Sequence, residues 1–220
     1  MKKRFMIVGL GILGRALAKT LSENGCEVIA VDESRHEVEL IKDFVSVAAE
    51  CDATDAKALK QLGCSDLDAA VVCIGEQFES AVLATAHLLD LGVRFVAARA
   101  NSPVEESILK RLGAHEIFSV ESSIGKILGD KFANPSVLTE MTLEDGYKII
   151  QWEATKKIDA KSLVELKLPA TYGVQVVAIK GRADGAMQLP TAESVICNGD
   201  RVLILGNEEK LRNFLNHWKE

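Results

Sequence analysis

The chain has 220 residues, of which 48% are apolar and 26% are charged, and its formal net charge at pH 7 is -6. This length allows one substantial core, or an ordinary core with a small second module. The acidic balance and the lack of an extended basic run argue against nucleic acid as a partner. No apolar stretch reaches the roughly 20 residues of a membrane-spanning helix, so we expect a protein of the cytoplasm.

A glycine motif stands near the start of the chain. The apolar run Phe5–Val8 leads directly into Gly9-Leu10-Gly11-Ile12-Leu13-Gly14, a helical pattern follows, and the next apolar run, Val28–Val31, ends at Asp32. This order is typical of dinucleotide-binding folds, in which the glycines allow a tight turn and close approach of a pyrophosphate. A carboxylate at Asp32 would accept ribose hydroxyls and repel a 2'-phosphate, which favours NAD or an adenine nucleotide over NADP.

Short apolar runs and longer amphipathic segments alternate as far as Ser119, which predicts an α/β fold with a Rossmann-like, doubly wound parallel sheet. The predicted strands are Phe5–Val8, Val28–Val31, Val45–Ala48, Ala69–Ile74, Phe95–Ala98 and Glu116–Ser119. The predicted helices are Leu13–Glu23, Arg35–Lys42, Asp55–Leu62, Glu79–Leu91 and Val104–Leu112. Gly25, Gly63, Gly92 and Gly113 stand where helix C-caps are expected.

Ligands of such sheets bind beyond the carboxyl ends of the strands, so we expect the residues there to form one site. The predicted nucleotide-binding residues are Gly9, Gly11, Ile12, Leu13, Gly14, Asp32, Glu33, Asp52, Ala53, Thr54, Ile74, Gly75, Arg99 and Asn101. Arg99 is a candidate for contacting phosphate oxygens, with a solvated arginine at a strand end as the alternative. Glu121 is a candidate ligand for a cation, or a simple acid at a helix start.

The spacing of apolar residues along the chain changes after Glu121. A helix predicted from Ser123 to Phe132 ends before Asn134-Pro135, which gives a nucleotide-binding domain with a crossover helix over residues 1–134. Residues 137–220 read as a small α+β regulatory domain. Its predicted strands are Lys148–Ala154, Val174–Ile179 and Arg201–Leu205, and its closing helix is Glu208–Trp218.

No pattern predicts a catalytic residue. The four histidines, His36, His87, His115 and His217, lie in predicted helices, beside a helix end or near the terminus, where packing or solvated roles are common. The chain also lacks a nucleophile elbow, a zinc-ligand cluster and a Walker lysine. We therefore favour binding without turnover, with an NAD-dependent dehydrogenase as the main alternative. A redox-sensing repressor would require a basic recognition helix, and none is evident.

Several segments keep the order and spacing of one known family. They are GLGILG at 9–14, VIAVDES at 28–34, CDATD at 51–55, VVCIGE at 71–76, ARAN at 98–101, RLGAHEIFSVESSIG at 111–125, and parts of 160–179 and 198–203. In these segments the chain resembles the RCK (regulator of potassium conductance) family, the cytosolic subunits of Ktr- and Trk-type potassium uptake systems. The resemblance covers nearly the whole chain.

The resemblance implies a non-enzymatic regulatory subunit that gates a membrane potassium channel or transporter. It implies bound ATP, ADP or NAD(H), and a homodimer that assembles into an octameric ring on a membrane-embedded potassium-translocating subunit, at the inner face of the cell membrane. The resemblance implies that the motif glycines bind the phosphates and that Asp32 binds the ribose. It also implies that Arg99 binds the outer phosphates. Glu121 would contact a divalent or monovalent cation, or a neighbouring subunit.

Two positions depart from the family pattern. Many members have an arginine after the second glycine, where this chain has Ile12. Some relatives bind cyclic di-AMP between two C-terminal modules and use an arginine where this chain has Pro169. The residues that would line such a regulatory site here are Leu163, Val164, Tyr172 and Pro190.

Overall fold

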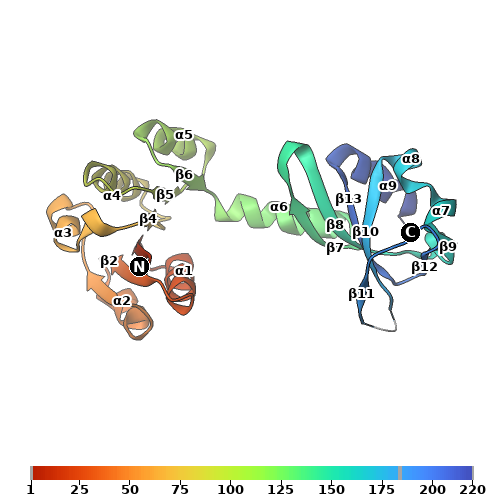
Figure 1. The fold of residues 1–220 in the computed structure, drawn as a ribbon. Coiled ribbons are helices and arrows are strands. Elements are labelled where there is room, and N and C mark those ends of the chain that lie inside the picture. The colour runs from red at the N-terminus through yellow and green to blue at the C-terminus, as the bar shows by residue number, and fades with distance from the viewer. Residues whose placement is uncertain (1, 183–184, 220) are drawn as a thin grey trace. The chain divides into compact units, whose positions relative to one another are not determined.

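The computed structural model describes residues 2–182 and 185–219. The chain divides into two compact units, Met1–Ile124 and Gly125–Glu220, and the division falls inside helix α6, Val120–Ala133 (Figure 1). The first unit contains a parallel sheet and the second an antiparallel sheet. The domain ranges 1–134 and 137–220 stay a prediction.

The first unit is a six-stranded parallel sheet in the order β3-β2-β1-β4-β5-β6. Its strands are β1 (Arg4–Val8), β2 (Glu27–Asp32), β3 (Val47–Glu50), β4 (Ala69–Val72), β5 (Val96–Arg99) and β6 (Glu116–Phe118). Its helices are α1 (Ile12–Glu23), α2 (Arg35–Ile41), α3 (Ala56–Gln61), α4 (Phe78–Asp90) and α5 (Pro103–Leu112). The predicted doubly wound fold is confirmed.

Each face of this sheet has its own core because the strands are covered on both sides. Helices α1 and α2 pack on one face, where Ala18 and Val38 meet strand residues such as Ile7. Helices α3, α4 and α5 pack on the other, where Leu59, Leu88 and Leu109 meet strand residues such as Met6 and Val72 (Figure 1). Adjacent residues of β1 therefore point to opposite cores.

One predicted strand of this unit was misplaced. The sequence predicted a strand at Val45–Ala48, but Lys42–Phe44 forms a 3-10 turn after α2 and the strand runs from Val47 to Glu50. The chain therefore joins the sheet later than the apolar residues suggested. The four glycines predicted at the helix ends all have positive φ, from +79° to +104°, which confirms their role there.

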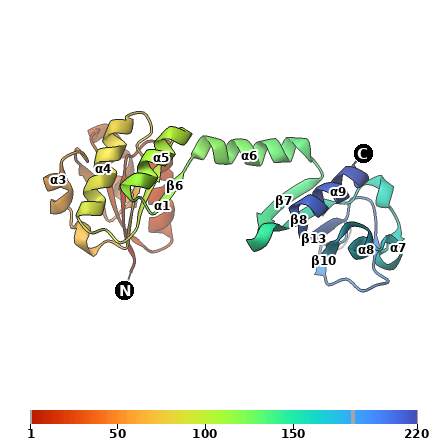
Figure 2. The ribbon, with the colours of Figure 1, turned by 90° about the horizontal axis from the view of Figure 1, so that it is seen from above.

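The second unit is a five-stranded antiparallel sheet in the order β11-β10-β13-β8-β7, with a two-stranded sheet, β12-β9. Its strands are β7 (Val137–Thr142), β8 (Tyr147–Glu153), β9 (Lys161–Ser162), β10 (Val174–Lys180), β11 (Met187–Gln188), β12 (Val195–Ile196) and β13 (Arg201–Asn207). Its helices after α6 are α7 (Leu163–Leu166), α8 (Leu168–Tyr172) and α9 (Glu208–Trp218), seen from above in Figure 2. Trp152 and Phe214 pack edge to face in its core, with ring centroids 5.1 Å apart.

The α+β reading of this unit and its closing helix are confirmed, but the sequence missed several elements. Strand β7 is an edge strand whose residues from Leu138 onward are exposed, so it lacks the apolar alternation that predicts strands. The short helices α7 and α8 are separated by Lys167, which has a positive φ of 47°. Such brief elements carry little periodicity.

Helix α6 begins at Val120 rather than at Ser123 as predicted. Its apolar residues Ile124, Ile127, Leu128 and Phe132 recur at helical spacing and are all exposed. An apolar stripe of this kind is typical of a surface that packs on another polypeptide. None of the helices in the described part of the chain combines the length and the apolar character that spanning a bilayer requires.

Candidate nucleotide-binding site

The glycine motif forms the turn between β1 and α1. Gly9 has a φ of +90°, and a Cβ there would lie 2.9 Å from the backbone nitrogen of Ile74. A Cβ on Gly14 would lie 1.8 Å from the carbonyl oxygen of Gly9. By contrast, a Cβ on Gly11 would meet no atom of the described residues within 4 Å, so the backbone at Gly11 faces open space. The first and third glycines are thus required by packing, and the second leaves room for a ligand.

Helix α1 begins beside this open space. Its N-cap is Gly11, no described side chain caps its first turn, and that turn contains no acidic residue. Ile12 is 86% exposed, while Leu13 packs against the core between α1 and the sheet. The first N–H groups of a helix without a cap and its positive dipole end favour an anion such as phosphate.

Asp32 closes β2 and faces the glycine turn. Its Oδ2 accepts the N–H of Leu10 at 2.6 Å, and its Oδ1 accepts the N–H of Ser34 at 2.8 Å. Two oxygens of a carboxylate offer about four acceptor positions, so these bonds leave capacity for sugar hydroxyls. Glu33, the next residue, is exposed. The structure therefore brings Asp32 and the glycine motif together.

The segment after β3 comes next to β2, since the N–H of Cys51 donates to the carbonyl of Asp32 at 2.9 Å. Asp52 Oδ1 accepts the hydroxyl of Thr54 at 2.7 Å and its N–H at 2.8 Å, and these bonds lower the pKa of Asp52. Ala53 is buried, and His87 of α4 lies 3.0 Å from the carbonyl of Thr54. The sequence predicted a packing or solvated role for His87, and this contact joins it to a segment far away in the chain.

Gly75, Arg99 and Asn101 lie together at the ends of β4 and β5. A Cβ on Gly75 would lie 2.5 Å from Arg99 Nη1, and Asn101 donates from its side chain to the carbonyl of Gly75. Arg99 also forms an ion pair with Glu121. Its Nε is buried and has no hydrogen-bond partner among the described residues, which leaves a donor to be satisfied. Ile74 links this group to the motif through its contact with Gly9.

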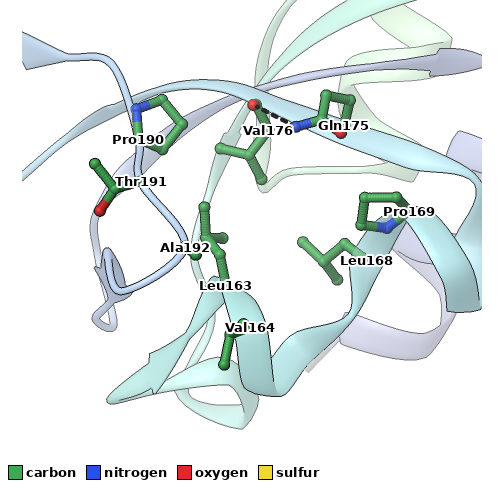
Figure 3. Close-up of a pocket in the computed structure, with 9 residues that line it drawn as sticks. All are labelled: Leu163, Val164, Leu168, Pro169, Gln175, Val176, Pro190, Thr191 and Ala192. Carbon is green, nitrogen blue, oxygen red and sulfur yellow. Dashed lines mark hydrogen bonds between the residues drawn. The ribbon is translucent and has the colours of Figure 1, made fainter.

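The four residues predicted for the regulatory domain divide into two groups. Leu163, Val164 and Pro190 line a pocket of about 240 Å³, whose other lining residues are Leu168, Pro169, Gln175, Val176, Thr191 and Ala192 (Figure 3). Tyr172 instead packs in the core, with its ring 5.7 Å from that of Phe214. The lining is mainly apolar and joins residues from α7, α8, β10 and the loop before β12.

Metal ligands do not cluster in residues 2–182 and 185–219, where no three His, Cys, Asp or Glu side chains could together hold an ion. Glu121, the predicted cation ligand, is paired with Arg99. A cation at Glu121 would therefore need oxygens from a bound phosphate as well.

Comparison with known families matches both units. The TrkA-N domain family matches residues 5–120, and the TrkA-C domain family matches residues 153–217. Over 214 residues the chain is 31% identical to the Ktr system potassium uptake protein C of Bacillus subtilis and 29% identical to the Ktr system potassium uptake protein A of the same bacterium. Each alignment covers 97% of this chain and 96% of the relative.

Solved structures agree with this fold. The crystal structure of the GsuK RCK domain matches with a TM-score of 0.57 and 23% identity, covering 96% of this chain and 45% of that chain. The crystal structure of GsuK bound to ADP matches with a TM-score of 0.51 and 25% identity, covering 59% of this chain and 33% of that chain. The chain thus spans less than half of each GsuK chain. With matching domains over both units and full-length relatives, this chain belongs to the Ktr and Trk family of potassium uptake proteins, with TrkA-N and TrkA-C domains.

Proposed function

We propose that this chain is a nucleotide-sensing regulatory subunit that gates a membrane potassium channel or transporter. The observation that carries the proposal is the glycine turn, whose open backbone at Gly11 and uncapped α1 lie beside the carboxylate of Asp32. This arrangement offers donors to a phosphate and acceptors to a ribose. The potassium uptake proteins to which the chain is similar over nearly their full length support the regulatory role.

The ligand of the first unit is ATP, ADP or NAD(H) in this proposal. Asp32 accepts ribose hydroxyls, and the motif glycines present backbone N–H groups to the phosphates. Arg99, whose Nε has no hydrogen-bond partner in residues 2–182 and 185–219, interacts with the outer phosphates. ADP in one GsuK structure and NAD in another are bound by proteins of the same fold, which supports this class of ligand. Binding then shifts conformations without consuming the nucleotide.

Two further ligands belong to the proposal. A divalent or monovalent cation would bridge phosphate oxygens and the carboxylate of Glu121. Part of the ion pair between Glu121 and Arg99 would then be replaced by the contact with the cation. In the second unit, cyclic di-AMP is the proposed occupant of the pocket lined by Leu163, Val164 and Pro190. Its apolar walls suit the faces of a purine. Pro169 on this wall supplies no charge for the phosphates.

The proposed partners are further copies of this chain and a membrane-embedded potassium-translocating subunit. The exposed apolar stripe of α6 supports a homodimer, because covering Phe132 and its neighbours removes apolar surface from water. An octameric ring of such dimers would sit at the inner face of the cell membrane. Co-purification of the chain with a potassium-translocating subunit, and the mass of the assembly in solution, test these two points.

Calorimetry with ADP, ATP, NADH and NADPH tests nucleotide binding by the full chain. We expect the first three to bind and NADPH to bind more weakly, since Asp32 repels a 2'-phosphate. The variant Asp32→Asn should narrow the difference between NADH and NADPH, and Asp43→Asn, an exposed acid beyond α2, serves as its control. If the unaltered chain bound none of the four, the proposal would be wrong.

A further inference from the structure

The peptide groups on both sides of Leu10 are held by charged side chains. Leu10 is fully buried in the middle of the glycine turn. Its N–H donates to Asp32 Oδ2 at 2.6 Å, and its carbonyl accepts from Arg15 Nη1 at 2.7 Å. Both bonds involve a charged partner and are therefore stronger than ordinary backbone bonds. The turn is thus fixed from β2 on one side and from α1 on the other.

Arg15 is itself fixed by Glu37. The two side chains form an ion pair, and each is only 28% exposed. Arg15 lies in the fourth position of α1, where the positive end of the helix dipole disfavours a cation. Glu37 compensates this charge from the first turn of α2, where an acid is favoured. A chain of contacts therefore runs from Glu37 through Arg15 to the carbonyl of Leu10.

This chain of contacts sets the direction of one N–H group. In a trans peptide the C=O and the N–H of the next residue point in opposite directions. The carbonyl of Leu10 points to Arg15, so the N–H of Gly11 points away from it. Gly11 is the residue whose backbone faces open space, and it stands at the N-cap position of α1 without providing a side-chain cap. The bond from Arg15 thus orients a donor for a phosphate.

We infer that Arg15 and Glu37 are positioning residues that preorganise the glycine turn for the phosphates of a nucleotide, and this inference rests on the proposed function. Nη1 of Arg15 is directed to the carbonyl of Leu10 and to Glu37, so in this inference Arg15 acts through the backbone and is not itself a phosphate ligand. In the alternative arrangement Arg15 would bind the phosphate directly, and its ion pair with Glu37 would compete with that binding. The two arrangements predict opposite effects of neutralising Glu37.

The experiment measures ADP binding by calorimetry and adenosine binding by NMR titration, using the full chain. We expect Arg15→Met and Glu37→Gln each to weaken ADP binding about tenfold or more, since each removes a charged contact that supports the turn. Adenosine has no phosphate, so its affinity should stay within about twofold. Arg15→Lys should restore part of the ADP affinity because lysine still donates to the carbonyl of Leu10.

Two controls match these variants. Lys19→Met removes another cation from α1, and Glu39→Gln removes another acid from α2. Both residues are exposed; Lys19 contacts Glu23 and Phe44, and Glu39 contacts Lys42. Neither control should change ADP affinity. Circular dichroism establishes that each variant retains the helical content of the unaltered chain.

Three results would overturn the inference. Tighter ADP binding by Glu37→Gln would make Arg15 a phosphate ligand released by the substitution. Unchanged ADP affinity in both variants would show that the pair does not support the turn. Equal weakening of ADP and adenosine would show a general structural role. These results require that the unaltered chain binds ADP, whereas a failure of that binding overturns the proposed function and this inference together.

Discussion

Two glycines of the same motif should fail in different ways when each is replaced by alanine. In Gly14→Ala the new Cβ would lie 1.8 Å from the carbonyl oxygen of Gly9, and both atoms belong to elements fixed by packing. Overpacking of this kind costs about 3 kcal/mol, and the better helix propensity of alanine returns about 1 kcal/mol. We therefore expect the free energy of unfolding of the first unit to fall by about 2 kcal/mol.

In Gly11→Ala the new Cβ would meet no atom within 4 Å in the part of the chain that the structure describes, and the φ of -58° is one that alanine adopts readily. The stability of the first unit should change by less than about 1 kcal/mol. The methyl group would nevertheless occupy the space through which a phosphate approaches the backbone. We expect ADP affinity to fall about tenfold or more, which corresponds to at least about 1.4 kcal/mol of binding free energy.

Urea unfolding can separate these effects because both tryptophans, Trp152 and Trp218, lie in the second unit. Their fluorescence reports the second unit and serves as an internal control, while circular dichroism also reports the helices of the first unit. ADP binding is measured by calorimetry on the same preparations. A stable Gly14→Ala variant, or a Gly11→Ala variant that binds ADP normally, would refute the reasoning.

Two further predictions concern single side chains. Replacing Lys148 by methionine removes the cation that lies 2.7 Å from Glu140 and 3.4 Å from Glu208, and should cost the second unit about 1–2 kcal/mol in urea unfolding followed by tryptophan fluorescence. The hydrogen bond with Glu140 raises the pKa of Lys148 above its usual value of 10.5. Between neutral pH and about pH 10 this contribution should therefore stay constant, and it should shrink as the pH rises through the higher folded value; a loss near neutral pH would contradict the prediction. Burial raises the pKa of the Cys73 thiol to about 12, so iodoacetamide at pH 8 should alkylate the exposed Cys197 first and Cys73 only after unfolding. Peptide mass spectrometry measures both rates, and equal rates in the folded protein would contradict the burial of Cys73.

Local patterns predicted the first unit well. The apolar run before Gly9, the helical spacing after it and the acid at the end of β2 are features of neighbouring residues, so they are legible in the sequence. The requirement for glycine at 9 and 14 also follows from the tight turn that this pattern implies. The misplaced β3 shows the limit, because the apolar Val45 suggested an early start, whereas the strand begins only at Val47, after the 3-10 turn Lys42–Phe44.

Contacts across the fold were not predictable in this way. The sequence named Arg99 and Glu121 separately, but their ion pair depends on how the end of β5 meets the start of α6. The sequence predicted that the ring of Tyr172 lines the regulatory pocket. In the structure α8 directs this ring into the core, where it packs against Phe214. Such outcomes depend on side-chain direction, which spacing along the chain does not specify.

By itself the sequence determined the class of fold, the glycine turn and the acid at the end of the second strand, since the order of strand, glycines, helix, strand and acid can be read along the chain. Only the tertiary structure decided that Arg15 reaches back to the carbonyl of Leu10 and is held by Glu37. The physical reason is that this pairing requires α1 and α2 to pack side by side on one face of the sheet, and their relative rotation is set by the shared core beneath them.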